Sequence, residues 1–306
     1  MYLLKKIISA LLEVHKAYSP TPRPTLIMTL LVKNEEDILE ENLKFHKAMG
    51  VDGFIVTDNN STDRTPDIIR KYEALGWVKK VICESGTNYN QKHWVDRMVW
   101  MAKKELGADW VINADADEFW YAPSGNLKDE LAASDANVLK CRAKVMYPEE
   151  GKPCWAWSQA ICPFTDPSVS GGYELSRYSL FVPQRDKVIH RATSYLQIAT
   201  GNHKVLMLPR KEKRSAVCIY HYPVKGKEHF LRKMINGGRQ LEQNPHKHIG
   251  QHWRYFYQMY KAGRLEEEYE RITGGAQYEQ LCRDGYIYSD TTVPDYFRQR
   301  LNYPGP

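Results

Sequence analysis

The sequence of 306 residues lacks any apolar stretch close to the roughly 20 residues that a membrane-spanning helix needs. Its six cysteines form no C-x-x-C pair, which argues against zinc-knuckle and thioredoxin-type motifs. Phenylalanine is scarce, with 8 residues beside 20 tyrosines and 8 tryptophans, so most aromatic rings carry a polar edge. We therefore expect a protein that does not cross a bilayer and that works in the cytoplasm, free or at the inner face of the membrane.

The positive charge is concentrated in one part of the chain. The formal net charge is +6, yet residues 201–264 hold 14 Lys and Arg against 3 Asp and Glu, a local +11 that leaves about −5 elsewhere. Such a segment favours an anionic partner, which could be ligand phosphates, acidic lipid headgroups or nucleic acid. A solvated basic surface without a ligand is the simpler alternative.

The first residues predict an amphipathic helix. The apolar run at residues 7–12 is followed at once by Glu13 and by no small-residue cleavage site, so we expect no signal peptide. The apolar side should pack on the body of the protein or on a second subunit, with a membrane surface as the alternative. A proline-rich linker, residues 20–24, ends the helix. The apolar positions at helical spacing are Leu3, Leu4, Ile7, Ile8, Leu11 and Leu12.

Strands and helices alternate from residue 25 onward. Apolar runs typical of buried strands occupy residues 25–33, 53–57, 78–83 and 110–113. Helical patterns lie between them, over residues 35–49, from residue 65, and over residues 91–106. This alternation predicts an α/β fold with a mostly parallel sheet and helices on both faces. Ligands of such sheets bind beyond the carboxyl ends of the strands.

Polar residues follow each predicted strand, where a ligand is expected. Some of them are explained by turn chemistry, because Asn, Asp and Ser are favoured in loops. Asp115, Asp117 and Glu118 are not, since three carboxylates within four residues repel one another. A divalent cation removes the repulsion, and carboxylate oxygens suit Mg²⁺ or Mn²⁺. The residues after the strands are Asn34, Glu35, Asp58, Asn59, Glu84, Asp115, Asp117 and Glu118.

Two segments carry a resemblance to a known family. LLVKNEEDILEENLKFHKAMGVDGFIVTDNNSTDRT and, further on, WVINADADEF resemble the nucleotide-sugar glycosyltransferases of family 2, in the bacterial branch with a D-x-D-E-F motif. The resemblance covers residues 25–125, and a looser match follows at His221, Tyr222 and Lys225. It implies a GT-A fold, a nucleotide-diphosphate sugar as donor, with a UDP-sugar as first choice, and Mn²⁺ or Mg²⁺ as cofactor.

The resemblance implies roles for residues of the first half. Asp115 would reach ribose and metal, Asp117 would be the direct metal ligand, and Glu118 would orient its neighbours. Family members commonly carry a carboxylate where Asn59 stands, so the identity of the base is open. The implied donor residues are Asn34 and Glu35 beside the nucleoside, Asp58 and Asn59 at the base, and Gln91 at the start of a helix that meets phosphate.

The basic second half would supply the remaining groups. Lys225 and Lys227 would close over the diphosphate, and His221 or His203 would complete the metal sphere. An inverting transfer needs a carboxylate to accept the acceptor's proton, for which Asp166 and Glu174 are the candidates. The aromatic stretches 147–157 and 253–257 are candidate acceptor platforms, and the second is equally consistent with a helix that packs on the body of the protein or on a membrane surface. Residues 119–121 could form a sugar platform, with core packing as the alternative.

The sequence thus predicts four segments: an N-terminal helix and linker (1–24), a nucleotide-sugar-binding half (25–125), an acceptor-side half (126–225) and a helical, aromatic and basic C-terminal region (226–306). The predicted function is the metal-dependent transfer of a sugar, with inversion, to a glycan or glycolipid. We expect it to belong to bacterial surface polysaccharide synthesis and to involve no nucleic-acid partner. A sugar nucleotidyltransferase is one alternative, although the segment LVKNEED lacks the glycine-rich phosphate loop. A non-catalytic protein that binds anionic lipid or nucleic acid is the other.

Overall fold

The computed structural model describes residues 2–13, 17–85, 91–165, 172–242 and 250–304. The chain divides into two compact units. The first consists of Met1–Ala143, Arg185–Tyr220 and Phe297–Tyr303, and the second of Lys144–Gln184, His221–Tyr296 and Pro304–Pro306. These units cross the segment boundaries predicted from the sequence, because the chain returns to the first unit twice. None of the helices described here combines the length and the apolar character that a membrane span requires.

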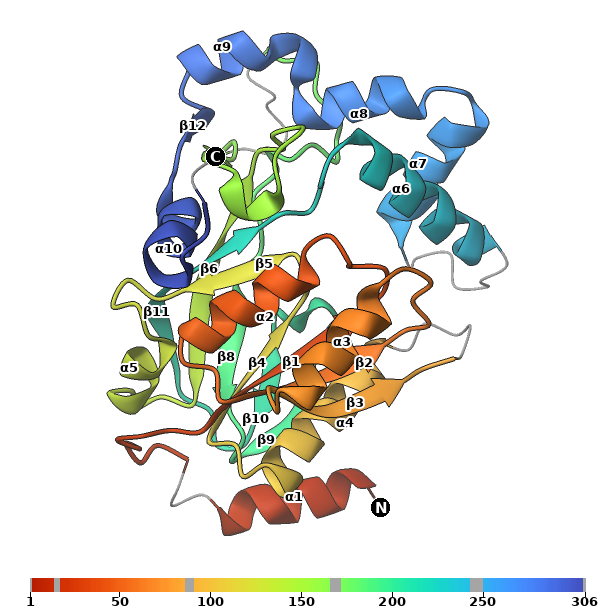
Figure 1. Ribbon diagram of the computed structural model, residues 1–306. Coiled ribbons are helices and arrows are strands. Elements are labelled where there is room, and N and C mark those ends of the chain that lie inside the picture. Colours follow the sequence, from red (N-terminus) through yellow and green to blue (C-terminus); the bar gives the residue numbers. More distant parts are fainter. Residues whose placement is uncertain (1, 14–16, 86–90, 166–171, 243–249, 305–306) are drawn as a thin grey trace. The chain divides into compact units, whose positions relative to one another are not determined.

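The first unit is built on a mixed sheet in the strand order β6-β8-β4-β1-β2-β3 (Figure 1). The four strands β1 to β4 run parallel to one another, and β8 runs antiparallel to both β4 and β6. The carboxyl ends of the parallel strands therefore lie at one edge of the sheet. The strands are β1 (Leu26–Val32), β2 (Gly53–Asp58), β3 (Val78–Cys83), β4 (Trp110–Ala114), β6 (Val138–Met146) and β8 (Lys187–Arg191).

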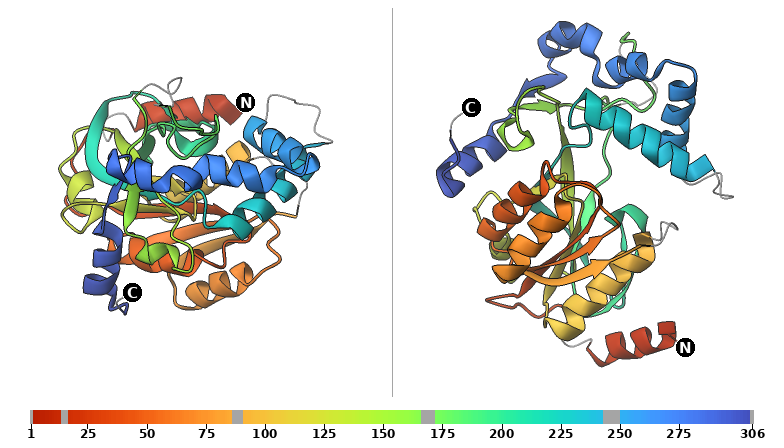
Figure 2. Two further views of the ribbon diagram at one scale, coloured as in Figure 1. Left: turned by 90° about the horizontal axis from the view of Figure 1, so that it is seen from above. Right: turned by 45° about the vertical axis from the view of Figure 1, so that its right-hand side comes forward.

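Helices cover both faces of this sheet, as the sequence predicts. Helices α2 (Leu39–Ala48) and α3 (Thr65–Ala74) lie on one face, and α4 (Gln91–Glu105) lies on the other (Figures 1 and 2). β1 is buried on both sides, so its apolar residues run continuously instead of alternating. α2 begins four residues later than predicted, because Asn34 takes a positive φ of 55° and residues 35–38 form a turn.

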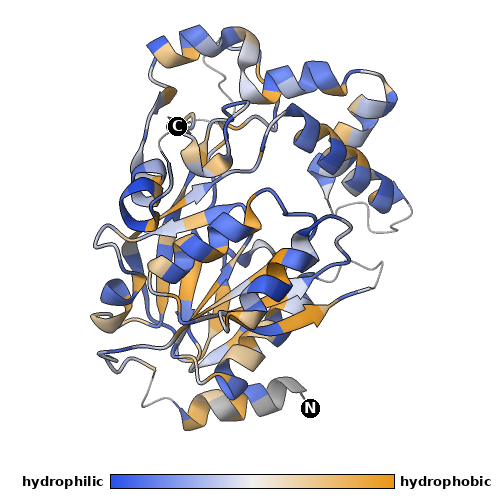
Figure 3. Cartoon of the chain, viewed as in Figure 1, coloured by the Kyte–Doolittle hydropathy of each residue, from blue (hydrophilic) through white to orange (hydrophobic). Residues whose placement is uncertain are grey.

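The remaining elements of the first unit complete its edges. Figure 3 shows that the strands of the sheet are its most apolar part, in keeping with a core shared by both faces. Phe297, at the end of the chain, packs on Phe45 of α2 and on Phe119. The other elements here are β5 (Glu118–Tyr121), α5 (Leu127–Ala132), β9 (Tyr195–Ile198), η3 (Thr200–Asn202), β10 (Val205–Met207) and β11 (Glu212–His221); α10 (Thr292–Leu301) carries Phe297.

Helix α1 (Tyr2–Leu12) turns a polar side toward the protein, contrary to expectation. The ammonium of Lys6 is buried, where it donates to Asp96 Oδ2 at 2.5 Å and to the Leu196 carbonyl at 3.0 Å. Ala10 lies on the same inward side. The predicted packing of the apolar stripe on the protein's own body is therefore wrong for its last members. These outward side chains are Ile8, Leu11 and Leu12, exposed to 49%, 55% and 74%.

The second unit confirms the predicted helical C-terminal region. Its short strand β7 (Gln159–Ile161) pairs antiparallel with the end of β6 and with β12 (Ile287–Ser289). Tyr147, Trp157 and Phe256 of the two candidate platforms are buried, and for Phe256 this confirms the alternative of a helix packed on the body of the protein. Its helices are η2 (Cys154–Ala156), α6 (Lys227–Glu242), α7 (Gln251–Lys261), α8 (Leu265–Thr273), η4 (Gly275–Gln277) and α9 (Tyr278–Arg283).

Glycine at position 238 lets α6 and α7 approach closely, which yields a first prediction. A Cβ atom on Gly238 would lie 2.2 Å from the Cβ of Tyr257. We expect Gly238→Ala to lower the free energy of unfolding by about 1–2 kcal/mol, since overpacking outweighs the better helix propensity of alanine. Chemical denaturation followed by circular dichroism measures this. Asn236→Ala, at an exposed position of α6, is the control, and equal stabilities of the two variants would contradict the close approach.

Candidate functional site

Two loops at the carboxyl edge of the sheet are tied into one platform. Asn34 and Glu35 follow β1, and residues 59–64 follow β2. The Asn34 N–H donates to Ser61 Oγ at 2.9 Å, and the Thr62 N–H donates back to Asn34 Oδ1 at 2.8 Å. The Glu35 N–H donates to Thr65 Oγ1 at 2.8 Å. These bonds fix the positions of both loops, so the residues predicted to meet a nucleoside lie side by side.

Asp58 and Asn59 lie in the same platform, at the end of β2. Both are buried. Asp58 Oδ1 accepts the Ser61 N–H at 3.1 Å and the Ser61 hydroxyl at 2.5 Å, which closes the turn. The Asn59 N–H donates to the Val32 carbonyl at 2.9 Å and continues the pairing of β1 with β2. One oxygen of Asp58 thus serves the turn, which leaves the other for a ligand.

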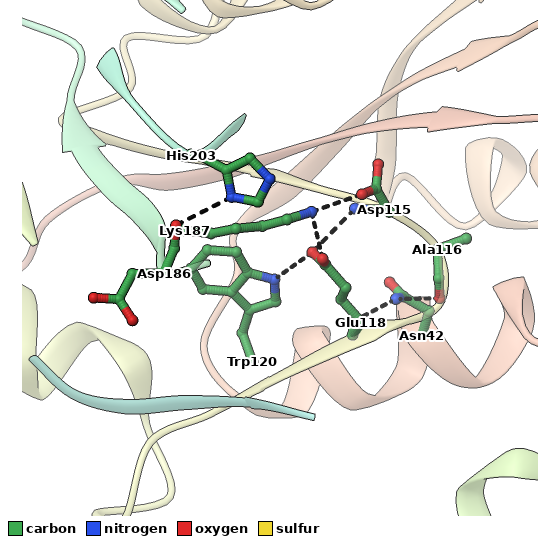
Figure 4. A network of polar contacts seen from close by, with 8 residues as sticks. All are labelled: Asn42, Asp115, Ala116, Glu118, Trp120, Asp186, Lys187 and His203. Atoms are coloured by element: carbon green, nitrogen blue, oxygen red, sulfur yellow. Dashed lines mark hydrogen bonds and ion pairs between the residues drawn. The ribbon is translucent and has the colours of Figure 1, made fainter. Parts of the chain in front are cut away.

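The acidic loop, residues 115–118, follows β4 at the same edge. Lys187 holds it from the neighbouring strand β8 (Figure 4). Its ammonium lies 2.6 Å from Asp115 Oδ2 and also contacts Glu118 Oε1. Because β8 is antiparallel to β4, with Ile189 opposite Ile112, its first residue reaches the point where β4 ends. A buried cation therefore compensates part of the repulsion that the sequence predicts for this loop.

Helix α2 holds the backbone of the acidic loop from the opposite side. The side-chain amide of Asn42 donates to the carbonyls of Ala116 at 2.8 Å and Glu118 at 2.9 Å. The Trp120 N–H donates to His46 Nε2 at 3.0 Å, so the proton of the neutral imidazole sits on Nδ1 and is donated to the Asn42 carbonyl at 2.9 Å. Both α2 side chains are fully buried. The loop is thus fixed through its main chain as well as through Lys187.

Burial controls the electrostatics of the loop. The pKa of Glu118 is raised to about 7, first by burial and then by the charges of Asp115 and Asp117, although Lys187 opposes the rise. Burial alone would lower the pKa of Lys187, but Asp115 and Glu118 outweigh it and raise that pKa. Lys187 therefore stays charged across the neutral range, and it faces one half-exposed and one buried carboxylate.

The donor atoms at the loop suit a hard divalent cation. Asp117 is buried, whereas the side chain of Asp115 is 38% exposed, so one carboxylate stays accessible beside the other. His203 lies beyond Lys187 in Figure 4, where its Nδ1 lies 3.1 Å from the Asp186 carbonyl. Burial lowers the pKa of His203, which favours the neutral imidazole that metals bind. The carboxylate oxygens of Asp115 and Asp117 are ligands of the kind that Mg²⁺ or Mn²⁺ prefers, and such a cation can also bind a diphosphate.

The described residues contain no group of three or more His, Cys, Asp or Glu side chains placed to hold a metal ion by themselves. Asp115, Asp117 and His203 belong to the first unit. His221, the fourth predicted ligand, is half-buried at the end of β11 and belongs to the second unit. A metal sphere with His221 stays a prediction.

The other predicted residues fall into three groups. Gln91 is the half-buried first residue of α4, in the first unit. Glu174, Lys225 and Lys227 belong to the second unit, where Lys227 pairs with Glu266 at 2.8 Å and the Glu174 N–H donates to Gln277 Oε1 at 2.9 Å. Asp166 lies outside the described residues. The proposed base and lid residues therefore stay predictions.

Three residues of the site escaped the sequence analysis: Lys187, Asn42 and His46. A lysine in an apolar strand is a signal, because burial of an ammonium requires a partner. Asn42 and His46 carry a weaker signal, since the other polar residues of the same helix are charged and only half-buried. Phe119 and Trp120 are fully buried, so the packing alternative is confirmed for them and no sugar platform forms there.

The sequence model of glycosyltransferase family 92 matches residues 28–269. No curated protein matches. Among solved structures, that of TarS residues 1–349 from S. aureus matches with a TM-score of 0.41 and 15% sequence identity. The match covers 84% of this chain and 74% of the TarS chain. The structure of the mannosyltransferase PcManGT from Pyrobaculum calidifontis, in complex with GDP-Man and Mn²⁺, matches with a TM-score of 0.42 and 14% sequence identity. That match covers 92% of this chain and 86% of the PcManGT chain.

The buried imidazole of His46 yields a pH prediction. Burial lowers its pKa to about 3, so between pH 6.5 and about 3 the unfolded chain binds a proton that the folded chain does not. The contribution of His46 to the free energy of unfolding is fully present above pH 6.5. It is lost as the pH falls, at up to roughly 1.4 kcal/mol per pH unit. We expect His46→Gln to reduce that slope, measured by denaturation at pH 7, 6 and 5. An unchanged slope would show that His46 is not buried and neutral.

Proposed function

Because the chain belongs to glycosyltransferase family 92, we propose that it transfers a sugar from a nucleotide-diphosphate donor, with a UDP-sugar as first choice, to a glycan or glycolipid. The enzyme class, a glycosyltransferase of GT-A fold, agrees with the sequence analysis, whereas the assignment to family 2 is not confirmed. The observation that carries the proposal is the acidic loop at the carboxyl edge of the parallel strands, beside the platform of Asn34 and Asp58.

The donor would lie across the two loops that follow β1 and β2. Asn34 and Glu35 would contact the nucleoside, and Asp58 and Asn59 would line the base pocket. Their hydrogen bonds to Ser61, Thr65 and Val32 hold the platform before a donor arrives, so little ordering is needed on binding. Gln91 would meet the donor at the start of α4.

Asp115 and Asp117 would hold the cation beside the diphosphate. When bound, Mn²⁺ or Mg²⁺ stabilises the negative charge that builds on the leaving diphosphate. Lys187 holds Asp115, and Asn42 holds the carbonyls of the loop, so both carboxylates keep their place. His203, neutral because of burial, would be a further ligand from the first unit.

We further propose an inverting transfer, in which a carboxylate accepts the proton of the acceptor hydroxyl. Glu174 is exposed in the second unit, and Asp166 is the other candidate. Lys225, Lys227 and His221, also of the second unit, would close over the diphosphate. The pathway we propose is bacterial surface polysaccharide synthesis, supported only by the resemblance of residues 25–125.

The two alternatives have less support. A sugar nucleotidyltransferase needs a glycine-rich phosphate loop after the first strand. Asn34 takes that place instead, with its N–H donating to Ser61 Oγ and its Oδ1 accepting the Thr62 N–H. Family membership favours sugar transfer over a non-catalytic binding protein. Nucleic-acid binding that is sensitive to salt and indifferent to Asp117→Ala would favour the latter.

The acidic loop yields the central test of the function. We expect Asp115→Asn and Asp117→Asn to reduce sugar-nucleotide hydrolysis and transfer by about 100-fold or more, because each removes charge that holds the cation at the diphosphate. The assay follows a panel of UDP- and GDP-sugars with Mn²⁺ or Mg²⁺. Asp129→Asn, exposed in α5, is the matched control and should keep full activity. Parent-like activity in folded loop variants would refute the metal–diphosphate proposal.

We propose that α1 contacts a membrane surface, which would place the enzyme at the inner face of the membrane. α1 lies against β9, which pairs with β10, and the following segment carries Arg210, Lys211, Lys213 and Arg214 against Glu212. Exposed apolar side chains together with basic ones suit anionic lipid. Among the described side chains, eight large apolar ones are exposed, and five of them belong to α1 or to residues 206–208: Ile8, Leu11, Leu12, Leu206 and Leu208.

Vesicle flotation tests the membrane contact. We expect the parent to float with phosphatidylglycerol vesicles more than with phosphatidylcholine vesicles, and the double variant Leu11→Ser with Leu12→Ser to float several-fold less, since it loses apolar area. Leu75→Ser, another exposed leucine of the first unit, is the control. The membrane contact is rejected if the parent does not float, or if the double variant floats as well as the parent. If the double variant instead loses a dimer that the parent forms, the surface belongs to a second copy of the chain.

A further inference from the structure

We propose that Lys187 is a positioning residue of the donor site, which acts by fixing the carboxylate of Asp115. Its ammonium lies 2.6 Å from Asp115 Oδ2 and contacts Glu118 Oε1 (Figure 4). The inference rests on the proposed function, because the orientation of Asp115 matters only if the acidic loop binds a donor. Nothing in the sequence motif itself assigns this lysine.

The position of the ammonium is fixed by the sheet and not by the loop. Lys187 is the first residue of β8, which pairs with β4 on one side and with β6 on the other. Its side chain is only 7% exposed, so it has little freedom to follow a moving partner. A carboxylate that binds this ammonium therefore takes a position set by two neighbouring strands.

The two carboxylates held by Lys187 differ in what they need. Glu118 is buried and also accepts from the Asp115 N–H at 3.3 Å and from Trp120 Nε1 at 3.4 Å, so it is held from three directions. Asp115 is 38% exposed, and water could solvate it without any ion pair. A lysine that only neutralised the buried glutamate would have no need to reach Asp115.

The contact with Asp115 has a geometric consequence more than an energetic one. Ion pairs with an exposed partner add little to stability. What the pair does is hold Oδ2 on the protein side, which leaves Oδ1 as the oxygen for a ligand. Asn42 fixes the backbone on either side of Asp117 through the carbonyls of residues 116 and 118. The side chain of one acid and the main chain around the other are thus held by different elements.

A double-mutant cycle tests whether Lys187 acts through Asp115. The variants are Lys187→Met, Asp115→Asn and their combination, and the readout is the Kd of UDP and of GDP with Mn²⁺, measured by calorimetry. We expect each single variant to weaken the tighter nucleotide about tenfold and the combination to be no more than about threefold weaker than Asp115→Asn alone. A structural role independent of Asp115 gives additive losses, about a hundredfold in the combination, and overturns the proposal.

Two further variants control for the loss of an ion pair as such and for the buried charge of Glu118. Lys140→Met removes an ion pair with Glu212 from the adjacent strand β6, and it should leave the nucleotide Kd within twofold of the parent. Lys187→Met leaves Glu118 buried without its cation, so the cycle is repeated in a Glu118→Gln background, where that charge is gone. The coupling between Lys187 and Asp115 must persist there, and its disappearance overturns the proposal.

The same measurements separate this inference from the function on which it rests. A parent protein that binds no nucleotide with Mn²⁺ refutes the donor site and the inference together. A parent that binds nucleotide, with losses that add in the cycle, refutes the role of Lys187 alone. Coupled losses support both.

Discussion

The repulsion among three carboxylates at the end of a buried strand is the constraint that shapes the first unit. Asp115, Asp117 and Glu118 follow β4, and two of them are buried, so their charges are costly without compensation. Lys187 supplies one cation from β8. An accessible oxygen on Asp115 remains, so the loop is only partly neutralised and retains an attraction for a second cation. The negative charge that Lys187 does not compensate makes this loop suited to binding a cation.

The parallel sheet turns distant segments into one site. Residues 34, 58 and 115 are far apart along the chain, yet each follows a parallel strand, and the pairing of Val32 with Asp58 and of Leu30 with Ala114 brings them to one edge. Hydrogen bonds between side chains and main chain then fix the loops. Asn42 and His46 of α2 add further hydrogen bonds of this kind. The position of α2 on one face of the sheet lets these two buried polar side chains reach the main chain after β4.

Sequence patterns predicted the first half well because its signals are local. Buried parallel strands appear as short continuous apolar runs, and turn residues and the carboxylates of the acidic loop follow them directly. The predicted strands and the helices between them are present, and the acidic loop lies where the pattern puts it. The prediction was wrong for the end of α1, where Lys6 is buried while Leu11 and Leu12 are exposed, because no helical periodicity shows that Asp96 and a backbone carbonyl are placed to bind an ammonium.

The sequence by itself determined the α/β class, the succession of the first four strands along the chain and the acidic loop after the fourth, since each depends on residues close together in the chain. Tertiary structure decided what surrounds that loop. Lys187 lies 72 residues after Asp115 and reaches it only because β8 runs antiparallel to β4, and Asn42 reaches Ala116 across 74 residues. Such partners are selected by strand order and helix placement, which no local pattern contains, and they give the loop its fixed geometry.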